Sequence, residues 1–287
     1  WYRCLECGRS FQSTRRPKKL REKLWKAYVS GKQTLKQLAA IAQRSHVWVR
    51  TRLDAIEVSL PAIAPRKTVL IVDTTFWGRC YGVCVFFSKE LKRAIWWHEV
   101  ESERMAHYHY GRKILETAGW QFSAVVVDGR RGFIKVFEGI PVQMCQFHQI
   151  KQVTKYLTCR PRTDAGRELR DLTLTLTKTD EAAFTTALNG WHAKWGAFIE
   201  EKTILEYSNG KRKWYYTHKK VRSAYRSLKH NLPYLFTYQK YPELNIPNTT
   251  NDLDGSFSAL KKKLAAHHGL RRDRRFKVIS QLLNGAR

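Results

Sequence analysis

Two apolar runs decide the fold of this chain: Thr68-Val69-Leu70-Ile71-Val72, with Asp73 after it, and Val125-Val126-Val127, with Asp128 after it. Short, continuous runs rich in β-branched residues are typical of strands that are buried on both faces. Further strand-like runs cover 80–87, 93–100 and 142–145, with helical runs at 102–118 and 131–137 between them. Three successive strands followed by alternating helices and strands predict a mixed sheet covered by helices.

The pattern changes on both sides of these strands. Helical spacing of apolar residues dominates 149–245, apart from a predicted hairpin at 204–216 around Ser208-Asn209-Gly210. We therefore predict an α/β fold: a ribonuclease-H-like mixed sheet with an all-α insertion, preceded by a small helix-turn-helix domain and a partial zinc-ribbon-like segment. The predicted segments are the zinc-ribbon-like part at 1–17, the helix-turn-helix domain at 18–60, the first part of the core at 67–148, the helical insertion at 149–245, and the last part of the core with a basic tail at 246–287.

The charge balance of the 287 residues indicates a polyanionic partner. The chain has 53 Lys and Arg against 24 Asp and Glu, a net charge of +29. A globular protein this basic repels itself unless it meets a polyanion, so nucleic acid is the expected partner. Hydrophobic residues make up 43% of the chain, which is enough for a core and excludes a mostly disordered protein. Because no apolar run is long enough to span a bilayer and six cysteines are too few for a disulfide framework, we expect a cytoplasmic protein with no membrane contact.

The N-terminal part combines a cysteine pair with three short basic helices. Cys4 and Cys7 have the spacing of half a zinc site, in which two thiolates hold one side of Zn2+; a metal-free turn is the alternative. Helical spacing runs from 18 to 56 and is broken by two turns. This pattern predicts a helix-turn-helix whose last helix, carrying Arg50 and Arg52, enters the major groove of DNA. A basic three-helix bundle that does not bind DNA is the alternative.

The two aspartates that follow apolar runs are the first candidate site residues. In an open α/β sheet, functional groups gather at the carboxyl ends of the strands, where Asp73 and Asp128 are expected. Carboxylates held close together need a cation to offset their repulsion, and hard oxygen ligands favour Mg2+ or Mn2+. The alternative is that each aspartate only caps the turn or helix that follows it.

Two motifs at the ends of the helical insertion carry a resemblance to a known family. The stretch Thr249-Thr250-Asn251-Asp252-Leu253-Asp254 and the pair Cys145-x-x-His148, together with the two strand-end aspartates, resemble the Mutator-type transposases of bacterial insertion sequences. That family carries a Thr-Thr-Asn-x-x-Glu signature at the start of a helix, so its glutamate falls on Asp254, which is one methylene shorter. Asp252 is an alternative ligand, although it points about 200° away around a helix. For the Cys145 and His148 pair, the alternative is a packed thiol beside a hydrogen-bonded histidine.

The resemblance implies a DNA transposase. Asp73, Asp128 and Asp254 would hold two Mg2+ or Mn2+ ions about 3.5–4 Å apart for cleavage and transfer of DNA strands. His148 and the run Lys261-Lys262-Lys263 would contact DNA. The expected partners are the double-stranded DNA of the terminal inverted repeats and of the target, bound by a dimer or higher oligomer at the bacterial nucleoid. A decayed or domesticated transposase that only binds DNA is the alternative.

Overall fold

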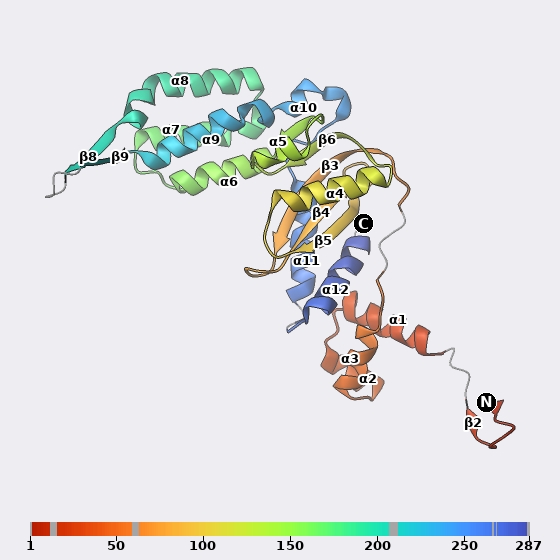
Figure 1. Cartoon of the computed structure of the whole chain (residues 1–287). Helices are drawn as coiled ribbons and strands as arrows, with labels where there is room; N and C mark the ends of the chain where they lie inside the picture. Colours follow the sequence, from red (N-terminus) through yellow and green to blue (C-terminus); the bar gives the residue numbers. More distant parts are fainter. Residues whose placement is uncertain are drawn as a thin grey trace. The chain divides into compact units, whose positions relative to one another are not determined.

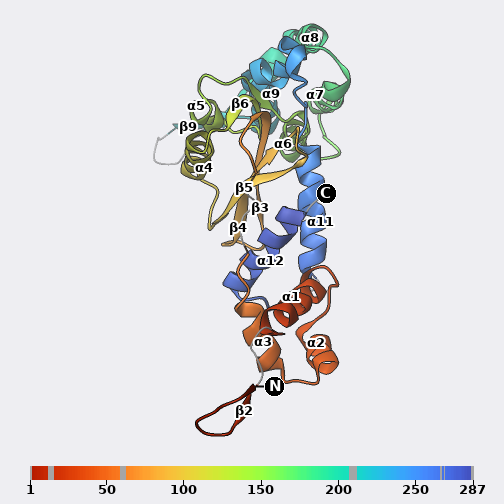
Figure 2. The same ribbon diagram turned by 90° about the vertical axis from the view of Figure 1, so that its right-hand side faces the viewer.

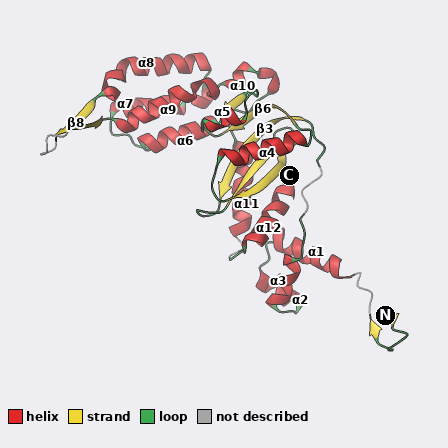
Figure 3. Ribbon diagram, in the orientation of Figure 1, coloured by secondary structure: helices red, strands yellow, loops and turns green. Residues whose placement is uncertain are grey.

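A computed structural model describes residues 2–11, 16–58, 63–206, 212–265, 267 and 269–285. The chain folds into two compact units, one formed by 64–253 and the other by 1–63 together with 254–287. Helices predominate in both units, and the main sheet belongs to the larger one (Figure 3). No described helix is both long and apolar enough to cross a membrane.

The larger unit is built on a five-stranded mixed sheet with the strand order β5-β4-β3-β6-β7. β3, β4 and β5 form an antiparallel meander, and Figure 1 shows these three strands together with β6. β3, β6 and β7 run parallel to one another. The strands are β3 (Lys67–Phe76), β4 (Gly82–Ser88), β5 (Arg93–Val100), β6 (Gln121–Val127) and β7 (Val142–Met144). The apolar runs of the central strands are fully buried. The mixed α/β sheet predicted from the sequence is therefore confirmed.

Helices account for most of the rest of the larger unit. α4 contacts the sheet, and α6, α7, α8 and α9 lie side by side (Figures 1 and 2). α9 is also in contact with β7. The helices are α4 (Met105–Thr117), α5 (Gly132–Val136), α6 (Gln146–Leu157), α7 (Asp164–Leu174), α8 (Glu181–Glu200), α9 (Lys219–Leu235) and α10 (Thr237–Lys240), with 3-10 turns at Leu176–Lys178 and Pro242–Leu244. The predicted hairpin is present as β8 (Lys202–Glu206) and β9 (Arg212–Tyr216), and its predicted turn at Ser208-Asn209-Gly210 lies outside the described residues.

Helix α4 lies unusually close to the sheet because Gly111 has no side chain. A Cβ at this position would lie 2.4 to 2.5 Å from ring atoms of Phe86 on β4 and Trp96 on β5. Tyr108, one turn earlier, is fully buried and packs on Phe86 and on Phe133 of α5. These aromatic contacts fix the position of α4 along the sheet.

Buried amide groups attach the helical part to the edge strand β7. Gln143 and Gln146 both donate a hydrogen bond from Nε2 to the carbonyl oxygen of Leu235, each at 2.9 Å. The Oε1 atom of Gln143 accepts a bond from the backbone N–H of Tyr238 at 3.0 Å. Because an unsatisfied buried amide costs about 1–3 kcal/mol, these bonds hold the end of α9 firmly against β7.

The smaller unit is assembled from the two ends of the chain. Its elements are β1 (Tyr2–Arg3), β2 (Ser10–Phe11), α1 (Arg16–Val29), α2 (Leu35–Ala42), α3 (His46–Asp54), most of α11 (Asn251–Ala265) and α12 (Arg272–Gly285). Trp25 on α1 donates a hydrogen bond to Gln281 on α12 at 3.2 Å. Arg274, only 4% exposed, donates Nε and Nη2 to the two carboxylate oxygens of Asp54, both at 2.8 Å. Residues 254–287 group with 1–63 through these contacts. The assignment of 246–287 to the last part of the catalytic core stays a prediction.

Two local expectations from the sequence are corrected. Asp73 does not follow its strand but lies inside β3, because residues 73–76 continue to pair with β4 after the parallel pairing with β6 has ended at Ile71. The strand expected to begin at Cys80 begins only at Gly82. Of the two cysteines in this stretch, Cys80 is exposed and Cys84 belongs to the core.

The three short helices expected between 18 and 56 are present, and their binding to DNA stays a prediction.

We expect Gly111→Ala to lower the free energy of unfolding by about 1–3 kcal/mol, because the new methyl group must displace a buried ring. Gly190→Ala in α8 is the matched control, since a Cβ there meets nothing within 4 Å. Alanine at that position should be neutral or stabilise the protein by up to about 1 kcal/mol. Urea denaturation followed by circular dichroism measures both variants, and equal effects would contradict the close approach of α4.

The buried arginine of α12 supports a second prediction. Asp54→Ala should destabilise the protein by about 2–3 kcal/mol, because it leaves the guanidinium of Arg274 buried without its carboxylate. Glu57→Ala removes an exposed acid three residues away and should change the free energy of unfolding by less than about 0.5 kcal/mol. Thermal and urea unfolding compare the two variants. A loss with Asp54→Ala no greater than with Glu57→Ala would mean that the ion pair contributes nothing.

Candidate functional site

Asp73 and Asp128 belong to neighbouring parallel strands. β3 pairs with β6 up to the position where Ile71 lies opposite Val126. Continuing this register by two residues sets Asp73 opposite Asp128, which directly follows β6. Neighbouring strands are about 4.8 Å apart, and residues in register point to the same face. This register would set the first two candidate acids side by side, but Asp128 does not belong to the group of potential metal ligands that contains Asp73.

The start of α11 is tied to the junction between β7 and α6. The carbonyl oxygen of Asn248 accepts a bond from the backbone N–H of Gln146 at 2.9 Å, and its side chain donates to Oε1 of Gln146 at 3.0 Å. Thr250 is fully buried and donates both its backbone N–H and its hydroxyl to the Sγ atom of Cys145, each at 3.4 Å. The Thr-Thr-Asn stretch is thus an anchor that fixes where the first turn of α11 points.

This anchor places Asp254, one turn after Thr250, beside Asp73. Asp73, His148 and Asp254 each offer one ligand atom, and these atoms all lie within 4.8 Å of one another. The three side chains are half-buried, and among the described residues they form the one group of three able to hold a metal ion. Asp252, the alternative ligand, is exposed and does not belong to this group.

The donor set fits a divalent cation. Two carboxylates at this separation repel each other, and a cation between them removes the repulsion. Carboxylate oxygens suit Mg2+ and Mn2+, whereas an imidazole nitrogen is more typical of transition metals. With His148 beside Asp73 and Asp254, the group suits Mn2+ at least as well as Mg2+.

Asp128 forms an ion pair with Arg130, two residues later in the chain. Its Oδ1 accepts a hydrogen bond from the backbone N–H of Arg130 at 3.0 Å, and its Oδ2 lies 3.1 Å from Nε of the same residue. Burial raises the pKa of the Asp128 carboxyl above its usual value, against the opposing effect of the Arg130 hydrogen bond and charge. The structure thus groups Asp73 and Asp254 with His148, while Asp128 points into an ion pair.

Glu103 is an acid of this site that the sequence reasoning missed. Its Oε2 lies 2.6 Å from Nη2 of Arg130, so one guanidinium bridges Glu103 and Asp128. Its Oε1 accepts a hydrogen bond from the Tyr108 hydroxyl at 2.6 Å, which in turn lies 2.6 Å from the Thr74 hydroxyl. Burial raises the pKa of Glu103. The sequence contained a pointer to Glu103, because this acid closely follows the strand-like run at 93–100, as Asp128 follows the run at 125–127.

The Cys145 thiol accepts the hydrogen bonds that hold Thr250 in the Thr-Thr-Asn anchor. Burial raises its pKa, but hydrogen bonds with His148 and Thr250 outweigh this effect, so that the pKa lies below its usual value. The sulfur therefore serves as an acceptor that positions the residues around it. Of the Cys145 and His148 pair, only His148 belongs to the group of potential metal ligands.

The cysteine pair near the N-terminus lies in the turn between β1 and β2. The backbone N–H of Cys4 donates to the carbonyl oxygen of Arg9 at 2.8 Å, and that of Gly8 donates to the carbonyl oxygen of Cys4 at 2.9 Å. Hydrogen bonds from the backbone N–H groups of Cys7 and Glu6 lower the pKa of the Cys4 thiol. No third potential ligand joins the two thiols among the described residues, so zinc binding stays a prediction.

The residues predicted to contact DNA outside this group are mostly exposed. Lys261, Lys262 and Lys263 lie exposed on α11, and Arg50 is exposed on α3. Arg52 is half-buried, with its guanidinium 3.6 Å from the ring centroid of Trp48 and a hydrogen bond to the backbone of that residue at 3.3 Å. Part of its side chain is thereby used in packing. Their contacts with DNA stay predictions.

No protein-family model and no curated protein sequence matches the chain. Among solved structures, the chain is similar to the Drosophila P element transposase strand transfer complex, with a TM-score of 0.42 and 10% sequence identity over 96% of this chain and 93% of that chain. A structural similarity this weak does not show what the chain does. The function is therefore inferred from the geometry of the acidic residues alone.

We expect the grouped ligands to bind Mn2+. Asp73→Asn and Asp254→Asn should each weaken binding of Mn2+ to the full chain by about 100-fold or more, because loss of a direct ligand costs at least as much as loss of an outer partner. Asp252→Asn, two residues earlier on the same helix, is the matched control and should leave the affinity unchanged. Isothermal titration calorimetry measures all three. Equal loss with Asp252→Asn and Asp254→Asn would contradict the assignment.

Proposed function

We propose that the chain is a DNA transposase of the DDE/D type, a metal-dependent enzyme that cuts and joins DNA strands at the ends of an insertion sequence. The observation that carries the proposal is the convergence of Asp73, Asp254 and His148 from three distant parts of the sequence. The resemblance to Mutator-type transposases and the net charge of +29 support the same function. The anchored Thr-Thr-Asn stretch supports Asp254 as the third acid although it is shorter than the family's glutamate.

Each acid has a definite task in this function. Asp73 and Asp254 hold the divalent cations, which when bound lower the pKa of the attacking hydroxyl or water and stabilise the leaving oxygen. Asp128 completes the acidic triad when its side chain leaves Arg130 and turns toward Asp73 on the neighbouring strand. The Arg130 guanidinium is then available for a phosphate of the DNA backbone. Tyr108 and Glu103 keep Arg130 beside the acids through the hydrogen-bonded chain that starts at Thr74.

The partners follow from the same proposal. The three N-terminal helices, with Arg50 and Arg52 on α3, bind the double-stranded DNA of the terminal inverted repeats. Lys261, Lys262 and Lys263 on α11 hold the DNA backbone near the acids. Two element ends brought together require a dimer or higher oligomer, active at the bacterial nucleoid. Cys4 and Cys7 contribute half of a zinc site to the end-binding part.

A second candidate function is that of a DNA-binding protein that no longer cuts. The ion pair between Arg130 and Asp128 favours it, because a guanidinium already supplies the positive charge that a metal ion would provide. The aspartate in place of the family's glutamate favours it as well. The two functions differ in a single measurable property, which is strand cleavage.

The test is cleavage of an oligonucleotide that carries the element's terminal repeat, identified from the DNA that flanks the gene. In Mn2+ or Mg2+ we expect nicking at the end of the repeat, and Asp73→Asn should slow it by at least about 1,000-fold without weakening DNA binding. Asp171→Asn, an exposed acid of α7, is the matched control. Binding without cleavage in either metal would leave only the second function, and cleavage unaffected by Asp73→Asn would contradict the mechanism.

A further inference from the structure

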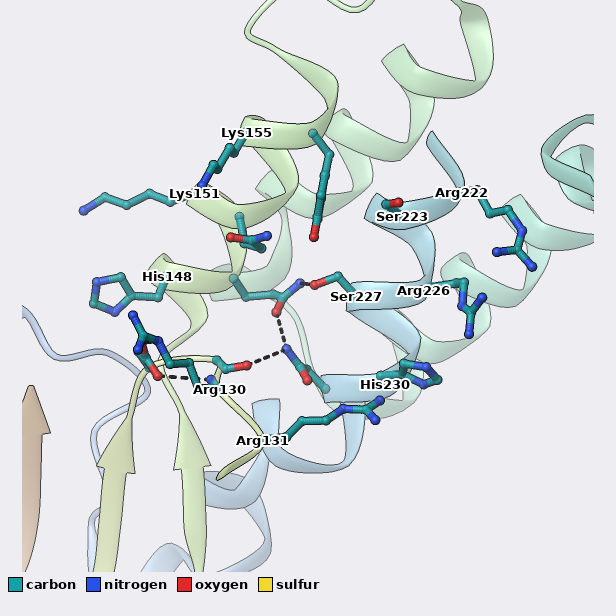
Figure 4. A pocket seen from close by; sticks show the side chains of 16 residues that line it. Arg130, Arg131, His148, Lys151, Lys155, Arg222, Ser223, Arg226, Ser227 and His230 are labelled. Carbon is teal, nitrogen blue, oxygen red and sulfur yellow. Dashed lines mark hydrogen bonds and ion pairs between the residues drawn. The ribbon is translucent and has the colours of Figure 1, made fainter. Parts of the chain in front are cut away.

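A basic groove runs between α6 and α9 and begins at Asp128. It encloses about 680 Å3, and Figure 4 shows cationic side chains on both of its walls. Lys151 and Lys155 come from α6, and Arg222 and Arg226 come from α9. Arg130 and Arg131 lie in the loop after β6 at the Asp128 end. Asp128 is the one acidic residue among the residues that line the groove.

The spacing of these residues explains why they share one groove. On α9, Arg222, Arg226 and His230 follow one another at intervals of four, which places them on the same face of the helix. On α6, Lys151 and Lys155 are likewise four residues apart. Each helix thus carries a row of positive side chains along the groove.

The floor of the groove is rigid. The Asn231 side chain donates to Oε1 of Gln149 at 2.8 Å and lies 3.4 Å from the carbonyl oxygen of Gly129. Gln149 in turn donates to the hydroxyl of Ser227 at 3.1 Å. These bonds tie α6, α9 and the loop after Asp128 to one another (Figure 4). The two rows of cations are therefore held at a fixed separation.

The groove has a strongly positive potential. Arg131, Lys155 and Arg226 are exposed, whereas Arg222 is paired with Glu200 at 3.0 Å. Burial and the nearby charges of Arg131, Arg226 and Lys229 keep the pKa of His230 below its usual value. The six lysines and arginines that line the groove outnumber the three described acids that pair with them, and this surplus of positive charge attracts an anionic ligand with several charges.

The positive surface continues beyond this groove. A second cleft of about 560 Å3 shares Tyr156 with the first. Its lining adds Arg160 and Arg162 from the turn after α6, and Lys220 from the start of α9. The two clefts adjoin at Tyr156, and we call them together the path; their combined volume is larger than a small anion requires. A chain of phosphates, rather than a single one, matches this shape.

We propose that this path binds the sugar–phosphate backbone of a single nucleic-acid strand that leads away from the acidic site. The groove between α6 and α9 encloses about 680 Å3, which is room for a short stretch of one backbone and not for a whole duplex. A basic groove with an aromatic ring for base stacking is how proteins hold single strands, and Tyr156 supplies such a ring. The identity of the ligand as nucleic acid rests on the proposed function, whereas the binding itself is independent of cleavage.

The test measures binding of a fluorescein-labelled single-stranded oligonucleotide to the full chain by fluorescence anisotropy, in EDTA so that no cleavage occurs. Lys151→Gln, Lys155→Gln and Arg226→Gln together should weaken binding by about 10- to 100-fold. The slope of log Kd against log salt concentration should fall by about 2, because each phosphate contact with a single strand contributes about 0.7. A single strand is the chosen probe since a helix-turn-helix reads duplex DNA.

The matched control removes the same charges from other exposed sites of the larger unit, with Arg66→Gln, Lys113→Gln and Lys178→Gln. It should change Kd by no more than about threefold. Circular dichroism verifies the fold of both triple variants. If the groove variant does not fold, Lys155→Gln alone replaces it, and its expected loss of about threefold is compared with Lys113→Gln alone, which should leave Kd unchanged.

Three outcomes decide the matter. A loss confined to the groove variant supports the proposal, even if the protein cuts no DNA under any condition. Equal binding by the groove variant and the control variant overturns it. Displacement of the oligonucleotide by micromolar ATP, lost in the groove variant, also overturns it, because the path would then be a nucleotide site.

Discussion

Like charges have to be held together against their repulsion before a cation can bind between them, and the scaffold of this protein does so with hydrogen bonds. Two carboxylates about 5 Å apart repel each other by about 3 kcal/mol at an effective dielectric constant of 20. Asp73 is fixed by strand pairing on β3, and Asp254 is fixed by the bonds of Thr250 to Cys145. Each such bond contributes about 0.5–1.5 kcal/mol, so several together are enough to keep the acids in place.

Arg130 contacts three parts of the larger unit: it pairs with Asp128, bridges to Glu103 and lines the acidic end of the groove between α6 and α9. A guanidinium in this position offsets part of the negative charge of two half-buried carboxylates as long as neither metal nor phosphate is bound. Its movement from carboxylate to phosphate would link the arrival of a nucleic-acid strand to the release of Asp128. The same side chain therefore belongs to both proposals made for this protein.

The strands of the sheet could be predicted from the sequence more accurately than the residues that surround the candidate acids. Continuous apolar runs identify buried strands whatever their partners, so β3 and β6 were recognised with little error. The end of β3 was misplaced because pairing with β4 decides it, and no local pattern reports that pairing. Glu103 followed a strand-like run and was missed because it was assigned to the next helix. The repeated spacing of Arg222, Arg226 and His230 was visible, but its meaning depends on which helix faces it.

The bond between Asp54 and Arg274 joins residues 220 positions apart in the chain. During translation, α1–α3 emerge from the ribosome long before α12 is made, so their contact surface for that helix stays uncovered until α12 follows. Long-range contacts of this kind form late and leave partly folded chains exposed. The N-terminal helices can therefore reach their final packing only after α12 has left the ribosome, so a product truncated before α12 leaves their contact surface exposed.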